Sequence, residues 1–119
     1  MEDKKMVKSN PEIAWRAEKI AMEQILSKLG FTELYHASAI KGYVPFDFVA
    51  THKGQRVLVD VATGINESLA YTSQISFADA LRMPIYILFV KLDFSKFQLR
   101  LDFGFRTNYV HFGELVPNE

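Results

Sequence analysis

Polar and apolar positions follow two different periods along this chain, which indicates helices in some segments and strands in others. Apolar residues recur at three- and four-residue steps after Asn10-Pro11-Glu12, a sequence typical of a helix start, and the pattern ends at Gly30. It predicts a helix over about 10–29 with one buried stripe, formed by Ala14, Ala17, Ala21, Ile25 and Leu29. A second helix is predicted from Asn66 to about Arg82.

The strands are predicted from runs rich in β-branched and aromatic residues that lie between turn residues. These runs are 33–38, 46–51, 56–63, 85–90, 97–103 and 109–112. The second and third are joined by His52-Lys53-Gly54-Gln55, which is typical of a β-hairpin. The fourth, IYILFV, is continuously apolar and indicates a strand buried on both faces. The fifth alternates polar and apolar residues, which predicts an edge or half-exposed strand, and the remaining C-terminal tail is expected to be irregular.

The order of these elements is helix, strand, hairpin, helix, strand, strand, which indicates an α/β fold. We expect a small sandwich in which a central mixed β-sheet is flanked by helices. The 119 residues suit a single domain, at 10–119, preceded by a flexible tail at 1–9.

Composition narrows the class of protein without naming a partner. A chain with 49% hydrophobic and 13% aromatic residues can form a core, which excludes a disordered protein. Its 14 basic and 14 acidic residues cancel, and the absence of cysteine excludes disulfides and thiolate metal sites. The N-terminus lacks the apolar stretch of a signal peptide, and no apolar run approaches the ~20 residues of a membrane span. We therefore expect a soluble, cytoplasmic protein with no membrane partner.

Three acidic residues occupy positions where the pattern calls for apolar ones. Asp60 lies in the middle of the strand RVLVDVATG, and Asp47 lies in VPFDFVA on the other strand of the hairpin. The spacing of the two places them nearly opposite each other, where like charges repel. Glu18 shares the stripe of the first helix with Ala21 and Ile25. A cation or metal ion would offset the cost of such burial.

Each of these acids also has a simpler interpretation. Glu18 can lie at the margin of the stripe and extend its side chain into water. Asp47 and Asp60 can both be solvated if that end of the hairpin is exposed. We expect instead that the three carboxyl groups converge at one end of the hairpin, on a common face of the sheet.

The segments AEKIAMEQILSKLGF, GYVPFDFVA and GQRVLVDVATG together resemble the PD-(D/E)XK nuclease superfamily, which includes restriction-endonuclease-like and Holliday-junction-resolvase-like proteins. Members carry a glutamate in the first helix, an aspartate that starts the hairpin and an acid-x-lysine motif on its second strand. Glu18, Asp47 and Asp60 match the three acids in order and spacing, and Pro45 precedes Asp47 with one residue between them. Resolvase-like members also carry a polar helix face behind the hairpin, often with a glutamine, where this chain has Tyr71, Thr72, Ser73 and Gln74.

The resemblance implies a restriction-endonuclease-like fold and a metal-dependent DNA endonuclease or junction-resolving phosphodiesterase. Double-stranded or branched DNA would be its partner. Mg²⁺ or Mn²⁺ would be bound by Asp47, Asp60 and the carbonyl of Val61, with Glu18 holding a metal-bound water or a second ion. The metal ion would assist in-line attack of water on the phosphodiester.

One position departs from the family pattern. The motif lysine is replaced by Ala62, and an alanine can neither orient the attacking water nor stabilise negative charge on phosphate. Lys41 is the cation we expect to substitute for it, because Arg56 lies four residues along the strand from Asp60, about 13 Å away. The alternatives are a degenerate member that has lost cleavage but still binds DNA or protein, and an interaction module in which the acids are incidental.

A homodimer is also expected, because the aromatic-rich C-terminal third offers apolar surface and two-fold dimers are the commonest oligomers.

Overall fold

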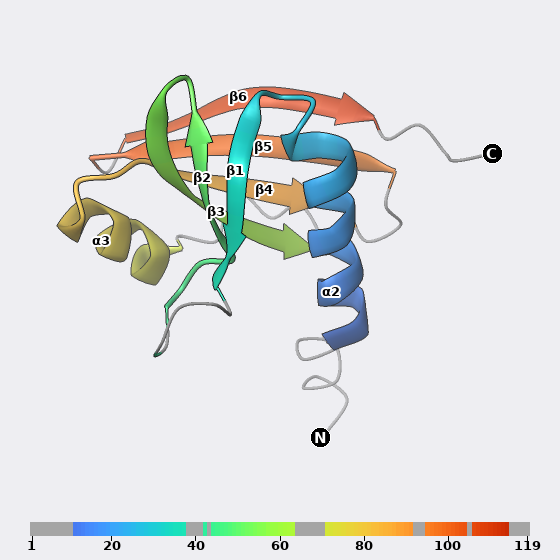
Figure 1. Ribbon diagram of the computed structural model, residues 1–119, viewed down its shortest axis with the longest axis horizontal. Coiled ribbons are helices and arrows are strands. Elements are labelled where there is room, and N and C mark those ends of the chain that lie inside the picture. The colour runs from blue at the N-terminus through green and yellow to red at the C-terminus, as the bar shows by residue number, and fades with distance from the viewer. Residues whose placement is uncertain are drawn as a thin grey trace.

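The computed structural model describes residues 11–37, 42, 44–63, 71–91, 95–104 and 106–114. Its helices are α2 (Pro11–Ile20), the π-helical segment η1 (Ala21–Leu26) that continues α2, and α3 (Thr72–Ala80) (Figure 1). Its strands are β1 (Phe31–His36), β2 (Phe48–His52), β3 (Gln55–Thr63), β4 (Ile85–Val90), β5 (Lys96–Phe103) and β6 (Arg106–Glu114).

The strands form one six-stranded mixed sheet in the order β1-β2-β3-β4-β5-β6. Neighbours are antiparallel except β3 and β4, which are parallel and have α3 between them in the sequence. Figure 1 shows β1 and β2 standing across the direction of β4, β5 and β6, as expected of a strongly twisted sheet. The prediction of an α/β domain with a central mixed sheet and flanking helices is confirmed.

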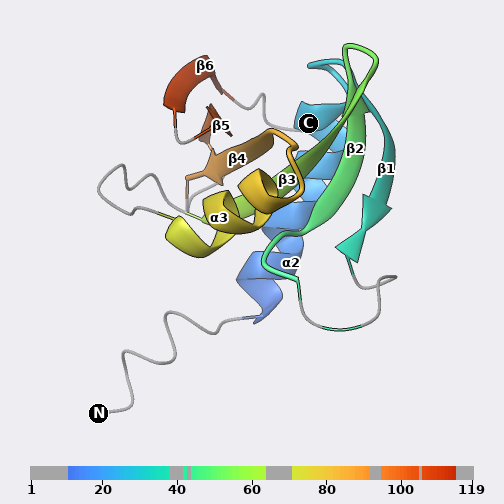
Figure 2. The ribbon, with the colours of Figure 1, turned by 90° about the vertical axis from the view of Figure 1, so that its left-hand side faces the viewer.

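The two helices cover opposite faces of the sheet and create two hydrophobic clusters (Figure 2). On the first face, Ala17 of α2 and Ala21 and Ile25 of η1 pack in a cluster that includes Val59 and Leu88. On the second face, α3 contributes Ala78 to a cluster with Leu58, Ile85, Ile87 and Phe89. Every residue of β4 is buried, because odd and even positions of this strand enter different clusters, as its continuous apolar sequence predicts.

The prediction that residues 97–103 form an edge or half-exposed strand is wrong. β6 pairs with β5 along its whole length, so β5 is an inner strand and β6 is the edge strand of the described sheet. The tail segment for which only a short strand at 109–112 is expected therefore forms a strand of nine residues. Three polar residues of β5 that the alternating pattern would leave exposed are buried, namely Gln98, Arg100 and Asp102.

The first helix keeps its predicted buried stripe at Ala17, Ala21 and Ile25, although its hydrogen bonding changes from α to π at Ala21. Gly30 follows with φ +91°, in the left-handed region where glycine is favoured. Several predictions fall outside the described residues: the tail at 1–9, the cap at Asn10, the side chain of Ala14 and the start of the second helix at Asn66. Within the described ranges, no helix is long and apolar enough to cross a membrane.

The hairpin between β2 and β3 turns through Lys53 and Gly54, which both have positive φ, +53° and +77°. Positive φ at both central residues defines a type I′ turn, which favours Asn-Gly because lysine is strained in the left-handed region. We expect Lys53→Asn to stabilise the protein by about 0.5–1 kcal/mol. Urea unfolding should show a higher midpoint at an unchanged slope, and Lys91→Asn, on an exposed residue with no positive φ, is the matched control. An equal change in both variants would contradict the turn assignment.

Candidate functional site

Asp47 lies immediately before β2 and extends the β2–β3 ladder with its side chain. The last register pair of the two strands is Phe48 with Val59, so residues 47 and 60 come next to each other. The Asp47 N–H donates a hydrogen bond of 2.9 Å to the Val59 carbonyl, and the Val61 N–H donates one of 2.7 Å to Asp47 Oδ2. The Asp47 carboxylate therefore accepts the bond that a backbone carbonyl would accept in a longer β2.

Asp60 is half-buried on β3 and belongs to the sheet face that α3 covers. The Gln74 amide of α3 donates a hydrogen bond of 3.4 Å to Asp60 Oδ2. Burial, together with the charge of Asp47 and a hydrogen bond to it, raises the pKa of Asp60 from 3.8 to about 8. A carboxyl group with this pKa is mostly protonated at neutral pH, because its ionised form is costly in the folded protein.

Glu18 reaches the same place from α2. Its Oε1 lies 2.7 Å from His36 Nε2 at the end of β1. Burial is the main factor that raises the pKa of Glu18, and the charge of Asp47 and a hydrogen bond with it raise it further. The charge of Glu18 in turn contributes to the raised pKa of Asp60. The structure thus brings Glu18, Asp47 and Asp60 together at one end of the β2–β3 hairpin, with Asp47 in the middle.

The expectation of one common face for the three acids is wrong for Glu18, a result that by the terms of that prediction counts against the nuclease interpretation. Its helix covers the first face of the sheet, whereas Asp60 belongs to the face covered by α3. The carboxylates meet because Asp47 lies at the end of β2, between the two faces. In this arrangement Asp47 is bonded to Val61 and Glu18 to His36, and no three His, Asp or Glu side chains of the described residues form a ready set of metal ligands.

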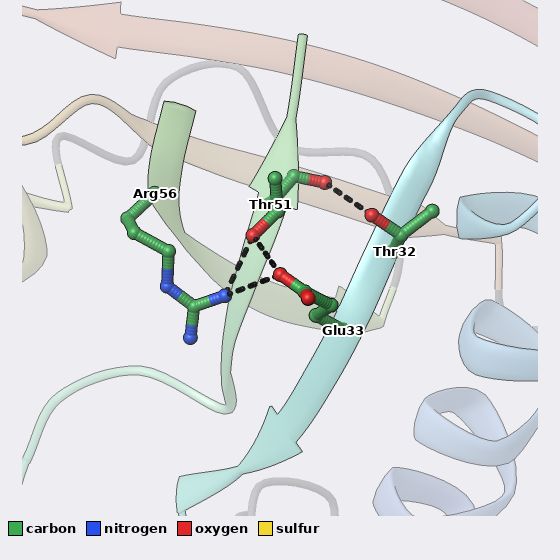
Figure 3. Close-up of polar contacts among 4 residues, drawn as sticks. All are labelled: Thr32, Glu33, Thr51 and Arg56. Atoms are coloured by element: carbon green, nitrogen blue, oxygen red, sulfur yellow. Dashed lines mark hydrogen bonds and ion pairs between the residues drawn. The ribbon is translucent and has the colours of Figure 1, made fainter. Parts of the chain in front are cut away.

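Two basic residues, Arg56 and Lys41, were considered as substitutes for the motif lysine, and the structure describes only Arg56. Arg56 lies near the start of β3, away from Asp60, and Figure 3 shows its contacts with Thr51 and Glu33. Its Nη1 donates a hydrogen bond of 2.7 Å to Thr51 Oγ1 and lies 3.6 Å from Glu33 Oε1. Its guanidinium also lies 5.5 Å from the ring of Tyr35. Lys41 lies outside the described residues.

A buried arginine near the acids was missed by the sequence analysis. The Arg100 side chain is 4% exposed, and its Nε donates a hydrogen bond of 2.8 Å to Asp102 Oδ2. Thr107 of β6 donates to the other carboxylate oxygen of Asp102. Burial lowers the pKa of Arg100, but its hydrogen bonds to Asp102 and Tyr109 more than offset this and leave the pKa raised. The signal in the sequence was the Arg-x-Asp spacing followed by a further run of β-forming residues.

Tyr71 connects this arginine to the acids. It precedes α3 in the left-handed conformation, with φ +52° and ψ +40°, which is uncommon for a residue other than glycine. Its ring meets that of Phe89 edge-on at 5.6 Å, and the Arg100 guanidinium lies 5.3 Å from its centroid. Burial raises the pKa of Tyr71, the charge of Asp60 raises it further and that of Arg100 lowers it. The phenol therefore remains a neutral hydrogen-bond donor at physiological pH.

The donor groups at this end of the hairpin suit a hard divalent cation. Carboxylate and carbonyl oxygens are the ligands that Mg²⁺ and Mn²⁺ prefer. Because the N–H and carbonyl of a strand residue point to the same side, the Val61 carbonyl is directed like the N–H that Asp47 accepts. Asp47, Asp60 and Val61 thus supply oxygens from adjacent backbone positions, and Glu18 adds a carboxylate beside Asp47.

Comparison of the chain with protein-family models, curated proteins and solved structures finds no significant match in any of the three.

Proposed function

We propose that this protein is a restriction-endonuclease-like domain that hydrolyses phosphodiester bonds of DNA with the help of Mg²⁺ or Mn²⁺. The order of the elements supports the proposal: one helix, three antiparallel strands, a second helix and a parallel strand. The positions of the acids also support it, because Glu18 lies on the first helix, Asp47 before the second strand and Asp60 on the third strand, the elements that carry acids in the PD-(D/E)XK pattern.

The proximity of Asp47 and Asp60 carries this proposal. A hydrogen bond joins their side chains, and burial with the charge of Asp47 raises the pKa of Asp60 to about 8. Each pKa unit corresponds to about 1.4 kcal/mol of differential interaction, so the ionised form of Asp60 is strongly disfavoured here. A bound cation would remove this penalty, whereas without one Asp60 keeps its proton and shares it with Asp47. Among the described residues, the hydrogen-bond partners of Asp60 are Asp47 and Gln74, neither of which is basic.

Each residue has a distinct role in this proposal. Asp47 and Asp60 would hold the ion together with the Val61 carbonyl, and Glu18 would hold a water of its hydration shell. Gln74 orients Asp60 through the hydrogen bond to Oδ2. When bound, the metal ion supplies charge neutralisation of the phosphate and a water molecule of lowered pKa for in-line attack.

Incubation of the protein with supercoiled plasmid and with a four-way DNA junction tests the activity. We expect nicking or junction cleavage in Mg²⁺ or Mn²⁺ and none in EDTA. Asp79→Asn, on an exposed acid at the far end of α3, is the matched control for loss of a carboxylate and should cleave like the wild type. No cleavage of either substrate in either metal ion would contradict the enzymatic proposal.

Ala62 supports a second candidate function, a degenerate member that keeps the cation site and binds DNA or protein without cutting. Ala62 is half-buried and packs in the cluster of Phe89 and Tyr71, so the position holds no charge. Isothermal titration with Mn²⁺ separates this candidate from an interaction module with incidental acids. Heat of binding without DNA cleavage supports the degenerate member, and no heat of binding excludes both metal-dependent candidates.

The homodimer stays a prediction. Large exposed apolar side chains lie on neighbouring strands at the β6 edge of the sheet, namely Phe103, Tyr109, Val110 and Phe112. A dimer that covered them would bury surface that is otherwise wet. Analytical ultracentrifugation at micromolar concentration tests it.

A further inference from the structure

A row of side chains leads from Asp60 across the sheet to Arg100. Asp60 of β3 is registered with Ile87 of β4, and Ile87 with Arg100 of β5. Two strand spacings place the Asp60 and Arg100 backbones about 10 Å apart on the face covered by α3. Arg100 is also registered with Tyr109 of β6, which makes a hydrogen bond with it. The row therefore puts a buried cation two strands away from a carboxylate that is costly to ionise.

Arg100 is fixed in place by its neighbours. Its side chain is 4% exposed and that of Asp102 is fully buried, so their 2.8 Å ion pair is shielded from water. The Arg100 guanidinium carbon lies 5.3 Å from the centroid of the Tyr71 ring and 5.5 Å from that of the Phe89 ring. Cation–π contacts of this kind are stronger when desolvated, so the contact with Arg100 favours the position that the Tyr71 ring occupies.

The Tyr71 ring packs near Ala62, in the region that a longer side chain at position 62 would enter. Ala62 of β3 is registered with Phe89 of β4, and the Tyr71 ring meets Phe89 edge-on at 5.6 Å. Ala62 and Tyr71 pack in the same cluster. Gln74, one turn further along α3, is hydrogen-bonded to Asp60. At position 62 the chain therefore has a small side chain, and the Tyr71 ring packs in the same cluster near the acids.

We propose that Tyr71 donates a hydrogen bond to a phosphate oxygen of the DNA strand bound at Asp47 and Asp60, and that Arg100 is the positioning residue that holds Tyr71 there. This inference rests on the function proposed above and adds the group that recognises the phosphate. A phenol keeps its proton at neutral pH and donates a single directional bond. The Tyr71 phenol would therefore take over one function of the missing lysine, contact with the phosphate. Because the phenol is neutral, it adds no further charge beside the buried Arg100–Asp102 pair.

The test compares two tyrosine–arginine pairs of the same chemistry. Tyr71→Phe and Arg100→Lys alter the proposed pair, and Tyr35→Phe with Arg56→Lys alter the exposed pair, whose guanidinium lies 5.5 Å from its ring. Binding of a fluorescein-labelled DNA duplex is followed by anisotropy in Ca²⁺, and Mn²⁺ affinity is measured separately by calorimetry. We expect Tyr71→Phe to weaken DNA binding about tenfold with Mn²⁺ affinity unchanged, because one hydrogen bond to a charged group is lost. Tyr35→Phe should stay within about twofold of the wild type.

A double-mutant cycle distinguishes positioning from an independent role of Arg100. If Arg100 acts through Tyr71, Arg100→Lys also weakens DNA binding and the double variant binds no more weakly than Tyr71→Phe. Additive losses, or a Tyr71→Phe protein that binds DNA within about twofold of the wild type, would overturn the inference. If Arg100→Lys does not fold cooperatively, the comparison of Tyr71→Phe with Tyr35→Phe decides whether Tyr71 contacts the phosphate. A wild type that binds no Mn²⁺ or no DNA refutes the proposed function, whereas a wild type that binds both, with DNA binding unchanged in Tyr71→Phe, refutes only this inference.

Discussion

Asp60→Asn should melt at a higher temperature than the wild-type protein in EDTA at pH 8. The folded-state pKa of Asp60 is raised from 3.8 to about 8, by burial first and by the charge of Asp47 second. Between these pH values the unfolded chain releases the Asp60 proton while the folded chain retains it, so stability falls as pH rises through this window. Above pH 8 the folded carboxylate is ionised and the full penalty is present. Asparagine avoids the penalty, and its carbonyl oxygen can still accept the bond from Gln74.

The expected gain is of the order of a few kcal/mol at pH 8 and should vanish near pH 4. Thermal melts of both proteins at the two pH values measure it. Mn²⁺ should reverse the order at pH 8, because a ligand that binds only the folded wild type stabilises it and the amide of the Asp60→Asn variant cannot supply a charged ligand. If Asp60→Asn melts well below the wild type in EDTA and neither protein responds to Mn²⁺, Asp60 is structural and the metal site is refuted.

Asp47 should respond differently to two substitutions that remove the same charge. Both Asp47→Asn and Asp47→Ala abolish repulsion with Asp60 and Glu18, and both should abolish Mn²⁺ binding. Asparagine retains an oxygen for the Val61 N–H, whereas alanine leaves this half-buried donor without its 2.7 Å partner. We expect Asp47→Ala to be less stable than Asp47→Asn by about 1–3 kcal/mol, the cost of an unsatisfied donor.

Urea unfolding in EDTA measures this difference directly, and calorimetry measures the loss of Mn²⁺ binding. Because the two variants share the loss of charge, their difference isolates the hydrogen bond to Val61. Equal stability of Asp47→Ala and Asp47→Asn would show that water satisfies the Val61 N–H and that Asp47 does not hold the end of the sheet.

The sequence predicted correctly those elements whose burial can be read from their own residues. The all-apolar β4 was predicted with its bounds, because a strand buried on both faces needs no information about its neighbours. Asp60 stood out for the same reason, as a carboxylate inside an apolar run of β3. The register of the β2–β3 hairpin followed from the two-residue turn, which placed Asp47 next to Asp60.

The rest depended on contacts between segments that are distant in the sequence. Residues 97–103 alternate as an exposed strand would, but Arg100 and Asp102 are buried and are hydrogen-bonded to Tyr109 and Thr107 of β6. Helical periodicity identified the stripe of Glu18, but it could not show that α2 and Asp60 lie on different faces of the sheet. The contact of His36 with Glu18 likewise arises only when β1 is placed against α2.

The bond between Val61 and Asp47 has a consequence for how this protein would evolve. In a lineage that no longer used the acids, drift would remove Asp60 first, because losing it relieves a cost. Asp47 would be retained in the same lineage as Asp or Asn, because selection for folding keeps an oxygen there regardless of activity. Retention of Asp60 across orthologues, and not that of Asp47, would therefore be the record of selection for chemistry at this hairpin.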